Sequence, residues 1–164
     1  MGLEQPWAIE DHGAKSASAS GSGECVTITA STKRTTSSAE ARSRSLKAAC
    51  LCAKAAEDTR GKDTLVLDLS EVTPIADYFV ITTGASGRQM NAVAEEVDRV
   101  MRASGGSRPR GVEGQRDSSW ILHDFGDIVL HVFNPEARKL YDLEHLWADA
   151  PRVDWKAALD GSSV

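Results

Sequence analysis

Residues 78–83 read YFVITT, a continuous run of aromatic and β-branched side chains that ends at Gly84. Such a run is typical of a strand that is buried on both faces of a sheet. Immediately afterwards, Ser86 and Gln89 have capping-box spacing, and apolar residues recur through residues 90–101 at helical intervals. This strand–turn–helix stretch predicts an α/β domain, because the apolar face of the helix must pack on the sheet.

The sequence before this stretch predicts a further helix and a further strand. Residues 37–56 are rich in Ala, Leu and Lys, and Ser37 with Glu40 forms a second capping box, so a helix is expected there. Residues 64–69 (TLVLDL) are mostly apolar and predict a buried strand.

The sequence after it predicts three more strands and a last helix. Residues 108–115 predict an edge strand, and residues 119–125 and 128–133 predict two strands joined by a tight turn at residues 126–127. Asn134 can cap the helix that follows. The connections include both a helix crossover and a hairpin, so the prediction is a mixed five-stranded sheet flanked by helices.

The composition fits one folded domain with an acidic surface. The chain has 164 residues with 24 acidic and 19 basic side chains, a formal net charge of −5. Residues 1–60 hold 8 basic and 7 acidic side chains, whereas residues 61–164 hold 11 basic and 17 acidic ones, a net charge of −6. Binding DNA or RNA through phosphates requires clustered Lys and Arg, so the acidic domain argues against it. A protein partner with a basic surface suits it better.

Both ends of the chain are expected to lie outside the domain. Residues 1–40 are rich in Ser, Ala, Gly and Thr and predict a disordered extension, residues 41–156 predict the α/β domain, and residues 157–164 predict a flexible tail. No apolar run approaches the roughly 20 residues of a membrane span. No secretory signal is visible at the N-terminus, so a cytoplasmic protein is expected.

The residue types that often carry catalysis do not form a recognisable set. Asp124 and Asp127 flank the predicted turn and would suit a two-metal site, but solvation of the turn is the simpler interpretation. His123 and His131 are interpreted as structural or interfacial groups, since no nucleophile accompanies them. The three cysteines have no metal or CxxC spacing and are expected to be reduced thiols. The sequence therefore predicts no enzyme, no cofactor and no metal.

Aromatic residues gather in the last third of the chain and suggest a protein-binding surface. Tyr, Trp and Arg are the residues that most often anchor protein interfaces. In a continuous last helix, Arg138, Tyr141 and His145 share one face. Another face carries apolar residues: Leu140, Leu143 and Trp147. The first face is either a docking patch or an ordinary solvated helix face, and periodicity favours neither.

Four stretches of the chain resemble the ribosomal silencing factors, the RsfS or Iojap-like family. In chain order they are residues 77–84 (DYFVITTG), 88–89 (RQ), 120–127 (WILHDFGD), and 131–133 (HVF) with 138–147 (RKLYDLEHLW). Each stretch alone is a modest match to the family, but the occurrence of all four in this order and spacing is highly specific for it. The resemblance extends from about Ser45 to Trp155.

The resemblance implies an α/β fold similar to that of nucleotidyltransferases, without catalysis. It implies binding to the large ribosomal subunit through the ribosomal protein L-fourteen, which blocks joining of the small subunit and represses translation when nutrients are short. Free members of the family form homodimers, and some members assist maturation of the large subunit. Two further hypotheses stay open: a nucleotidyltransferase-like enzyme that uses Asp124 and Asp127 with Mg²⁺, and an RNA-binding assembly factor whose basic strand carries Arg108, Arg110 and Arg116.

The resemblance also implies a partner-binding set in the late strands and the last helix: Trp120, Asp124, His131, Phe133, Arg138, Tyr141 and His145. Phe125 stands where Tyr is common in the family, so no hydroxyl contact is expected there. Residues 1–40 lie outside the resemblance. They are interpreted as a disordered tail, a misplaced start or an organelle transit peptide, and their acidic residues weigh against the last.

Overall fold

A computed structural model of the chain describes residues 31–105, 108–114 and 119–161. The elements follow in the order α1 (Ser31–Asp58), β1 (Lys62–Asp68), β2 (Tyr78–Thr83), α2 (Gly87–Ala103), β3 (Gly111–Glu113), β4 (Trp120–Asp124), β5 (Ile128–Phe133), α3 (Pro135–Tyr141), α4 (Leu143–Leu146), β6 (Arg152–Val153) and α5 (Trp155–Asp160).

The strands form one mixed sheet in the order β3-β4-β5-β2-β1-β6. The central pair, β2 and β5, is parallel, and the other neighbours are antiparallel. The mixed sheet is therefore confirmed, and β3 lies at its edge as the sequence predicts. The structure adds a sixth strand, β6, which pairs with β1. Its two residues are too few to produce a recognisable strand pattern.

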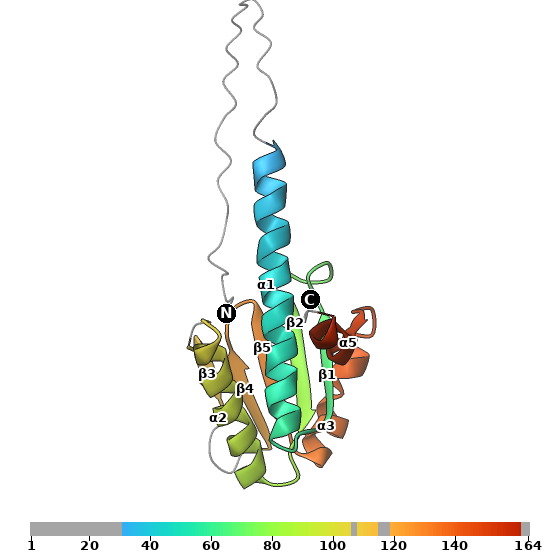
Figure 1. Ribbon diagram of the computed structural model, residues 1–164. Helices are drawn as coiled ribbons and strands as arrows, with labels where there is room; N and C mark the ends of the chain where they lie inside the picture. Colours follow the sequence, from blue (N-terminus) through green and yellow to red (C-terminus); the bar gives the residue numbers. More distant parts are fainter. Residues whose placement is uncertain (1–30, 106–107, 115–118, 162–164) are drawn as a thin grey trace, which may run out of the picture.

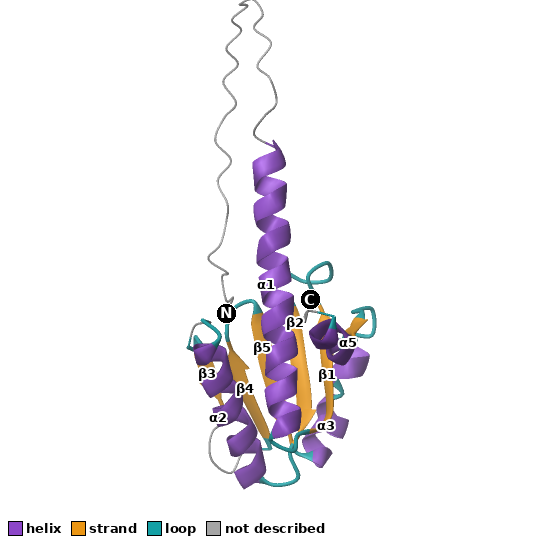
Figure 2. Cartoon of the chain, in the orientation of Figure 1, coloured by secondary structure: helices purple, strands orange, loops and turns teal. Residues whose placement is uncertain are grey.

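The sheet separates two hydrophobic cores. Helices α1, α2 and α5 cover one face, with α1 running along the middle of the sheet (Figures 1 and 2). Helices α3 and α4 contribute to the core on the other face. Successive side chains of β2 alternate between the two cores. Tyr78 and Val80 pack on the α1 side, while Phe79 and Ile81 pack on the α3 side. Both faces of β2 are buried, as its continuous apolar run predicts.

The caps of two helices follow the sequence signals. The Ser86 side chain accepts a hydrogen bond from the Gln89 backbone N–H, and the Gln89 side chain accepts one from the backbone N–H of Ala85. Asn134 caps α3 by accepting a 2.7 Å hydrogen bond from the Ala137 backbone N–H. These contacts fix where both helices begin, because they satisfy donors that the first helical turn leaves unpaired.

Asn134→Ala is expected to lower the free energy of unfolding by about 1 kcal/mol, since the Ala137 N–H then loses its partner. Urea denaturation measures the change. Asn91→Ala is the matched control, because Asn91 lies inside α2 and caps nothing. Equal stability of Asn134→Ala and the unaltered chain would contradict the assigned cap.

The ends of the domain differ from the sequence prediction. Helix α1 begins at Ser31, so Ser37 lies inside the helix and the capping box expected there does not start it. Residues 31–40, assigned to a disordered extension, are helical, and residues 1–30 lie outside the described residues. Helix α5 includes residues 157–160 of the expected tail. Both differences have one cause: adding a residue to an existing helix costs far less than nucleating it.

Candidate protein-binding surface

Six rings form a connected cluster on the face of the sheet opposite α1. We call it the aromatic cluster, and its members are Phe79, Trp120, His131, Phe133, Tyr141 and Trp147. The register of the β4–β5 hairpin places Trp120 opposite Phe133, with 4.9 Å between the ring centroids. The Tyr141 ring lies 4.7 Å from that of Trp120, and Trp147 lies 5.9 Å from Phe79. Rings of the two short helical segments thus pack on rings of the strands.

His131 is a buried, neutral member of this cluster. Its Nδ1 accepts a 3.2 Å hydrogen bond from Trp120 Nε1, so the neutral ring carries its proton on Nε2. That Nε2 atom is buried and has no hydrogen-bond partner among the described residues. Burial lowers the pKa of His131 to about 4, because the charged form would lose its hydration. His131 therefore supports the cluster structurally, as the sequence analysis favours, and does not hold a proton for catalysis near neutral pH.

Large apolar side chains next to the cluster are exposed. Leu140 is 78%, Tyr141 48% and Leu146 69% exposed. Isolated exposed apolar residues are ordinary, but here three of them lie within the short α3–α4 segment, whose Tyr141 ring packs on the partly exposed Trp120, and such a grouping is typical of surfaces that bind proteins. We call Trp120, Leu140, Tyr141 and Leu146 the docking surface. Of these four residues, only Trp120 and Tyr141 belong to the partner-binding set predicted from the sequence.

The predicted helix face of Arg138, Tyr141 and His145 does not exist as one face. Asp142 adopts a left-handed conformation with φ 42°, which ends α3 and starts α4. Asp tolerates this conformation better than most residues, and no Gly or Pro marks the break in the sequence. His145 therefore lies on α4, where its Nδ1 is 3.2 Å from an Asp142 carboxylate oxygen. The break also leaves Leu140 exposed while Leu143 is buried, so these two do not share the apolar face that a continuous helix predicts.

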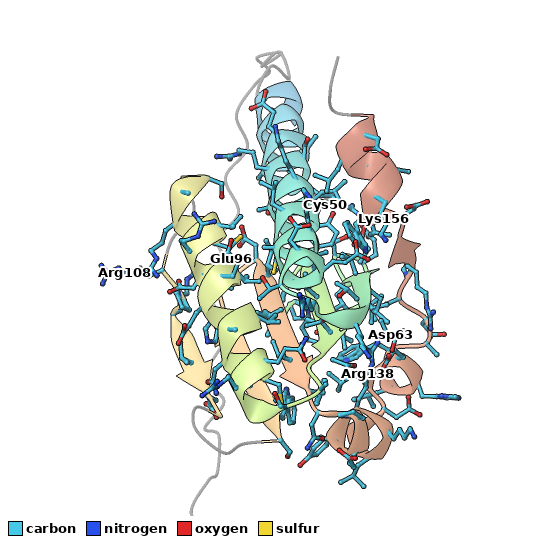
Figure 3. All side chains as sticks on the ribbon, turned by 60° about the horizontal axis from the view of Figure 1, so that its bottom comes forward. Cys50, Asp63, Glu96, Arg108, Arg138 and Lys156 are labelled. Carbon is cyan, nitrogen blue, oxygen red and sulfur yellow. The ribbon has the colours of Figure 1, made fainter. Side chains whose placement is uncertain are left out.

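Arg138 is largely buried and ion-paired, whereas the sequence analysis places it on a helix face available for docking. Its side chain is only 13% exposed, and that of its partner Glu144 is 19% exposed. Its Nε and Nη2 donate to one Glu144 oxygen at 2.9 and 2.7 Å, and Nη1 donates to Thr83 Oγ1 at 2.7 Å. It lies beside the start of β1, and Asp63 is labelled close by (Figure 3). These bonds tie α3 to α4 and to the end of β2.

Arg138→Ala is therefore expected to destabilise the fold by about 1.5 to 2 kcal/mol, because Glu144 and Thr83 lose charge-assisted hydrogen bonds in a partly buried site. Thermal and urea denaturation measure the loss. The matched control is Arg99→Ala, which removes an exposed ion pair with Glu96 and is expected to leave stability nearly unchanged. Equal effects of the two substitutions would contradict the structural role of Arg138.

Asp124 lies on the same face as the cluster but at the other end of β4. Its Oδ1 accepts a 2.6 Å hydrogen bond from the Gly126 backbone N–H, so it stabilises the hairpin turn. Glu113 lies opposite Leu122 across the β3–β4 pair, and directly opposed residues share a sheet face. Sequence analysis missed Glu113, since only the register reveals its side of the sheet. The two carboxylates make this edge of the face acidic.

The two carboxylates of the enzyme hypothesis do not meet. The Asp127 Oδ2 atom accepts a 3.2 Å hydrogen bond from Ser45 Oγ on α1, whereas Asp124 is bonded within its own turn. The described residues hold no group of three or more His, Cys, Asp or Glu side chains arranged to bind a metal ion. A two-metal site therefore finds no support in the hairpin.

The two cysteines within the described residues are buried thiols. Cys50 and Cys52 are free and buried, and burial raises the pKa of both thiols, which makes them unreactive. Cys25 lies outside the described residues. No helix in the described ranges has both the length and the apolar character needed to cross a bilayer.

Known proteins are similar to this chain in sequence and in fold. Residues 40–163 match the family described as ribosomal silencing factor during starvation. Ribosomal silencing factor RsfS of Bacillus subtilis is 39% identical over 104 residues, which span 63% of this chain and 87% of that protein. A mouse protein named mitochondrial assembly of ribosomal large subunit protein 1 is 33% identical over 88 residues, 52% of this chain and 39% of that protein. A crystal structure of a Chromobacterium violaceum protein superposes with a TM-score of 0.57 at 39% identity, covering 60% of this chain and 81% of that one.

Proposed function

This chain belongs to the family of ribosomal silencing factors, and we propose that it binds the large ribosomal subunit through the ribosomal protein L-fourteen. Bound there, it blocks joining of the small subunit and represses translation when nutrients are limiting. It acts in the cytoplasm by occupying a surface and catalyses no reaction. The observation that carries this proposal is the docking surface, where the α3–α4 segment exposes Leu140, Leu146 and a half-exposed Tyr141.

The make-up of the docking surface supports binding to a protein. Trp and Tyr contribute most when they sit in the centre of an interface and bring rigid contact area with little loss of entropy. Here the Tyr141 ring is already held against Trp120, with 4.7 Å between their centroids. A ring that is ordered before binding loses little freedom on binding, which favours affinity.

Charge supports a basic partner. Residues 61–164 carry a net charge of −6, and Glu113 and Asp124 share the sheet face of the aromatic cluster. Opposite charge on a ribosomal protein would speed encounter and fix its orientation, while the apolar contacts supply most of the affinity. The acidic domain also argues against contact through ribosomal RNA phosphates.

Co-sedimentation with separated ribosomal subunits tests the proposal. We expect the full chain to pellet with the large subunit and to stay in the supernatant with the small subunit alone. Added purified L-fourteen should compete for the chain and reduce the pelleted fraction. Binding to the small subunit only, or to neither subunit, would contradict the proposal. Light scattering of the free chain tests the expected homodimer separately.

A second candidate function is assistance in large-subunit assembly, which the name of the mouse relative favours. Deleting the gene and analysing ribosomes on sucrose gradients distinguishes the two functions. An assembly factor predicts accumulated precursors of the large subunit during rapid growth. A silencing factor predicts normal subunits and unrestrained translation after nutrient withdrawal.

A further inference from the structure

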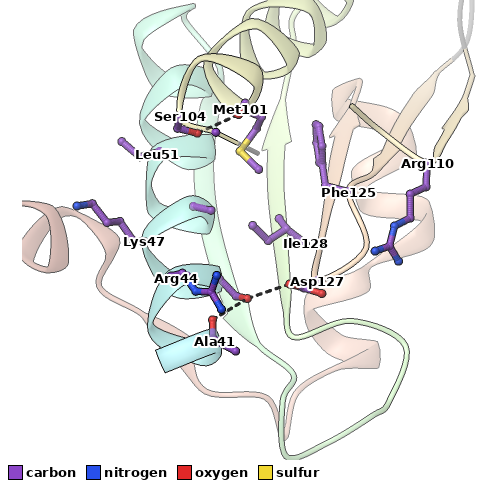
Figure 4. A pocket seen from close by; sticks show the side chains of 13 residues that line it. Ala41, Arg44, Lys47, Leu51, Met101, Ser104, Arg110, Phe125, Asp127 and Ile128 are labelled. Carbon is purple, nitrogen blue, oxygen red and sulfur yellow. Dashed lines mark hydrogen bonds between the residues drawn. The ribbon is translucent and has the colours of Figure 1, made fainter. Parts of the chain in front are cut away.

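A separate cleft lies on the helical face of the domain, on the opposite side of the sheet from the docking surface. Its volume is about 660 Å³, within the range of small-ligand sites. It lies between the middle of α1, the C-terminal end of α2 and the β4–β5 hairpin (Figure 4). Neither the aromatic cluster nor the docking surface contributes a residue to it.

Apolar side chains form part of the lining. They come from α1, α2, β5 and the hairpin, and they are Leu51, Met101, Ile128 and Phe125. Phe125 and Ile128 lie on the hairpin side, facing α1 across the cleft (Figure 4). An aromatic ring, a thioether and branched aliphatic chains together suit the flat face of a planar ring.

Two cations flank the same cleft, Arg44 on α1 and Arg110 on the hairpin side, whereas the Lys47 side chain on α1 points away from the hairpin (Figure 4). Neither Arg44 nor Arg110 forms an ion pair with another described residue. An acidic protein that leaves these cations unpaired around one cleft holds positive charge available for an anion.

The backbone of the hairpin makes room for Arg110. Gly126 has a φ of +97°, and a Cβ at that position would come within 2.6 Å of the Arg110 guanidinium carbon. Any other residue there would be strained and would push the guanidinium away. Asp127 is the one carboxylate in the lining, and it accepts a hydrogen bond from Ser45 rather than pairing with a cation.

We propose that this cleft binds a nucleotide, with its phosphates held between Arg44 and Arg110 and its base placed against Phe125, Met101 and Ile128. The two ends of the cleft differ in charge, and this difference sets the orientation of the bound nucleotide. Ser104 and Met101 mark the end of the cleft at the C-terminus of α2, away from Arg44 (Figure 4). The C-terminal end of a helix disfavours phosphate and accepts hydrogen bonds from amino groups, so the base lies toward Ser104. The site binds without chemistry, and its occupancy is independent of the docking surface.

Calorimetric titration of the full chain with ATP and with GTP tests this proposal, with adenosine and inorganic tripolyphosphate as part-ligand probes. We expect at least one nucleotide to bind with micromolar affinity, and adenosine and tripolyphosphate to bind at least about tenfold more weakly than that nucleotide. Absence of binding by both nucleotides at millimolar concentration would overturn the proposal. So would tripolyphosphate binding as tightly as the nucleotide, because the base would then contribute nothing.

Variants locate the binding to this cleft. Arg44→Ala and Arg110→Ala are each expected to weaken nucleotide binding by about tenfold, through loss of one charge-assisted contact. Arg88→Ala is the matched control, because Arg88 is an exposed cation at the opposite end of α2 and is expected to leave affinity unchanged. Tyr141→Ala should also bind as the unaltered chain does. Equal affinity of the Arg44→Ala and Arg110→Ala variants and the unaltered chain would overturn the assigned site.

Discussion

Tyr141→Ala is expected to weaken binding to the large ribosomal subunit by about 30-fold or more, equivalent to about 2 kcal/mol of binding free energy. Tyr141 is the most exposed ring of the aromatic cluster and packs on Trp120 from the side of the short helix α3. Truncating it removes contact area at the centre of the docking surface while the buried rings stay in place. A titration followed by co-sedimentation measures the dissociation constant.

Two control variants make this result specific. Tyr141→Phe keeps the ring and is expected to bind within a few fold of the unaltered chain, which separates ring contact from hydroxyl contact. Ile75→Ala removes an even more exposed apolar side chain from the β1–β2 connection, near the opposite end of β2 from α3. It should not change binding. Unchanged affinity of Tyr141→Ala would place the partner elsewhere on the domain.

The domain is expected to lose stability as the pH falls from about 6.5 to 4, with His131 contributing about 3 kcal/mol of the loss. The pKa of His131 is about 4 in the folded chain and 6.5 in the unfolded chain, so the unfolded chain binds the extra proton throughout this interval. The stabilisation contributed by His131 is fully present above pH 6.5 and is lost progressively as the pH falls from 6.5 to about 4. Burial also lowers the pKa of His123, which adds to the loss in the same direction.

His131→Gln isolates this contribution, because glutamine keeps an acceptor for Trp120 Nε1 and does not titrate. Urea denaturation at a series of pH values should give a shallower slope for His131→Gln than for the unaltered chain between pH 6.5 and 4.5. Parallel slopes for His131→Gln and the unaltered chain would contradict a buried neutral imidazole.

The fold could be predicted where local sequence signals are strong. The limits of β5 and the cap of α2 at Ser86 follow from apolar periodicity and capping chemistry. The break between α3 and α4 at Asp142 could not be predicted. No Gly or Pro marks it in the sequence, and it depends on Leu143 packing into the core. The start of α1 at Ser31 also lacks a signal, since polar residues there show no apolar face.

The candidate site was predicted in part for the same reason. Trp120, His131, Phe133 and Tyr141 do meet in space, as expected for residues of neighbouring strands and the helix after them. Arg138 looks like a surface anchor in the sequence, but its guanidinium reaches Thr83, 55 positions away in the chain. Such a contact depends on tertiary packing and leaves no trace in local spacing. The exposed Leu140 and Leu146 depend on the helix break and were missed with it.

The docking surface and the proposed nucleotide cleft lie on opposite sides of the sheet. Ile128, at the start of β5, reaches the cleft on the α1 side of the sheet, whereas Phe79, His131 and Phe133 lie on the other face of the β2–β5 pair. Variants of either site are therefore expected to leave the other unchanged. This separation lets the two proposals fail or succeed independently.

The most direct test of the central claim is light scattering of subunit joining at saturating concentrations of the chain. Large subunits are incubated with the chain before small subunits and Mg²⁺ are added. The account predicts that the unaltered chain suppresses the rise in scattering, and that Tyr141→Ala suppresses it only at about 30-fold higher concentration. Full subunit joining in the presence of saturating unaltered chain would contradict the account.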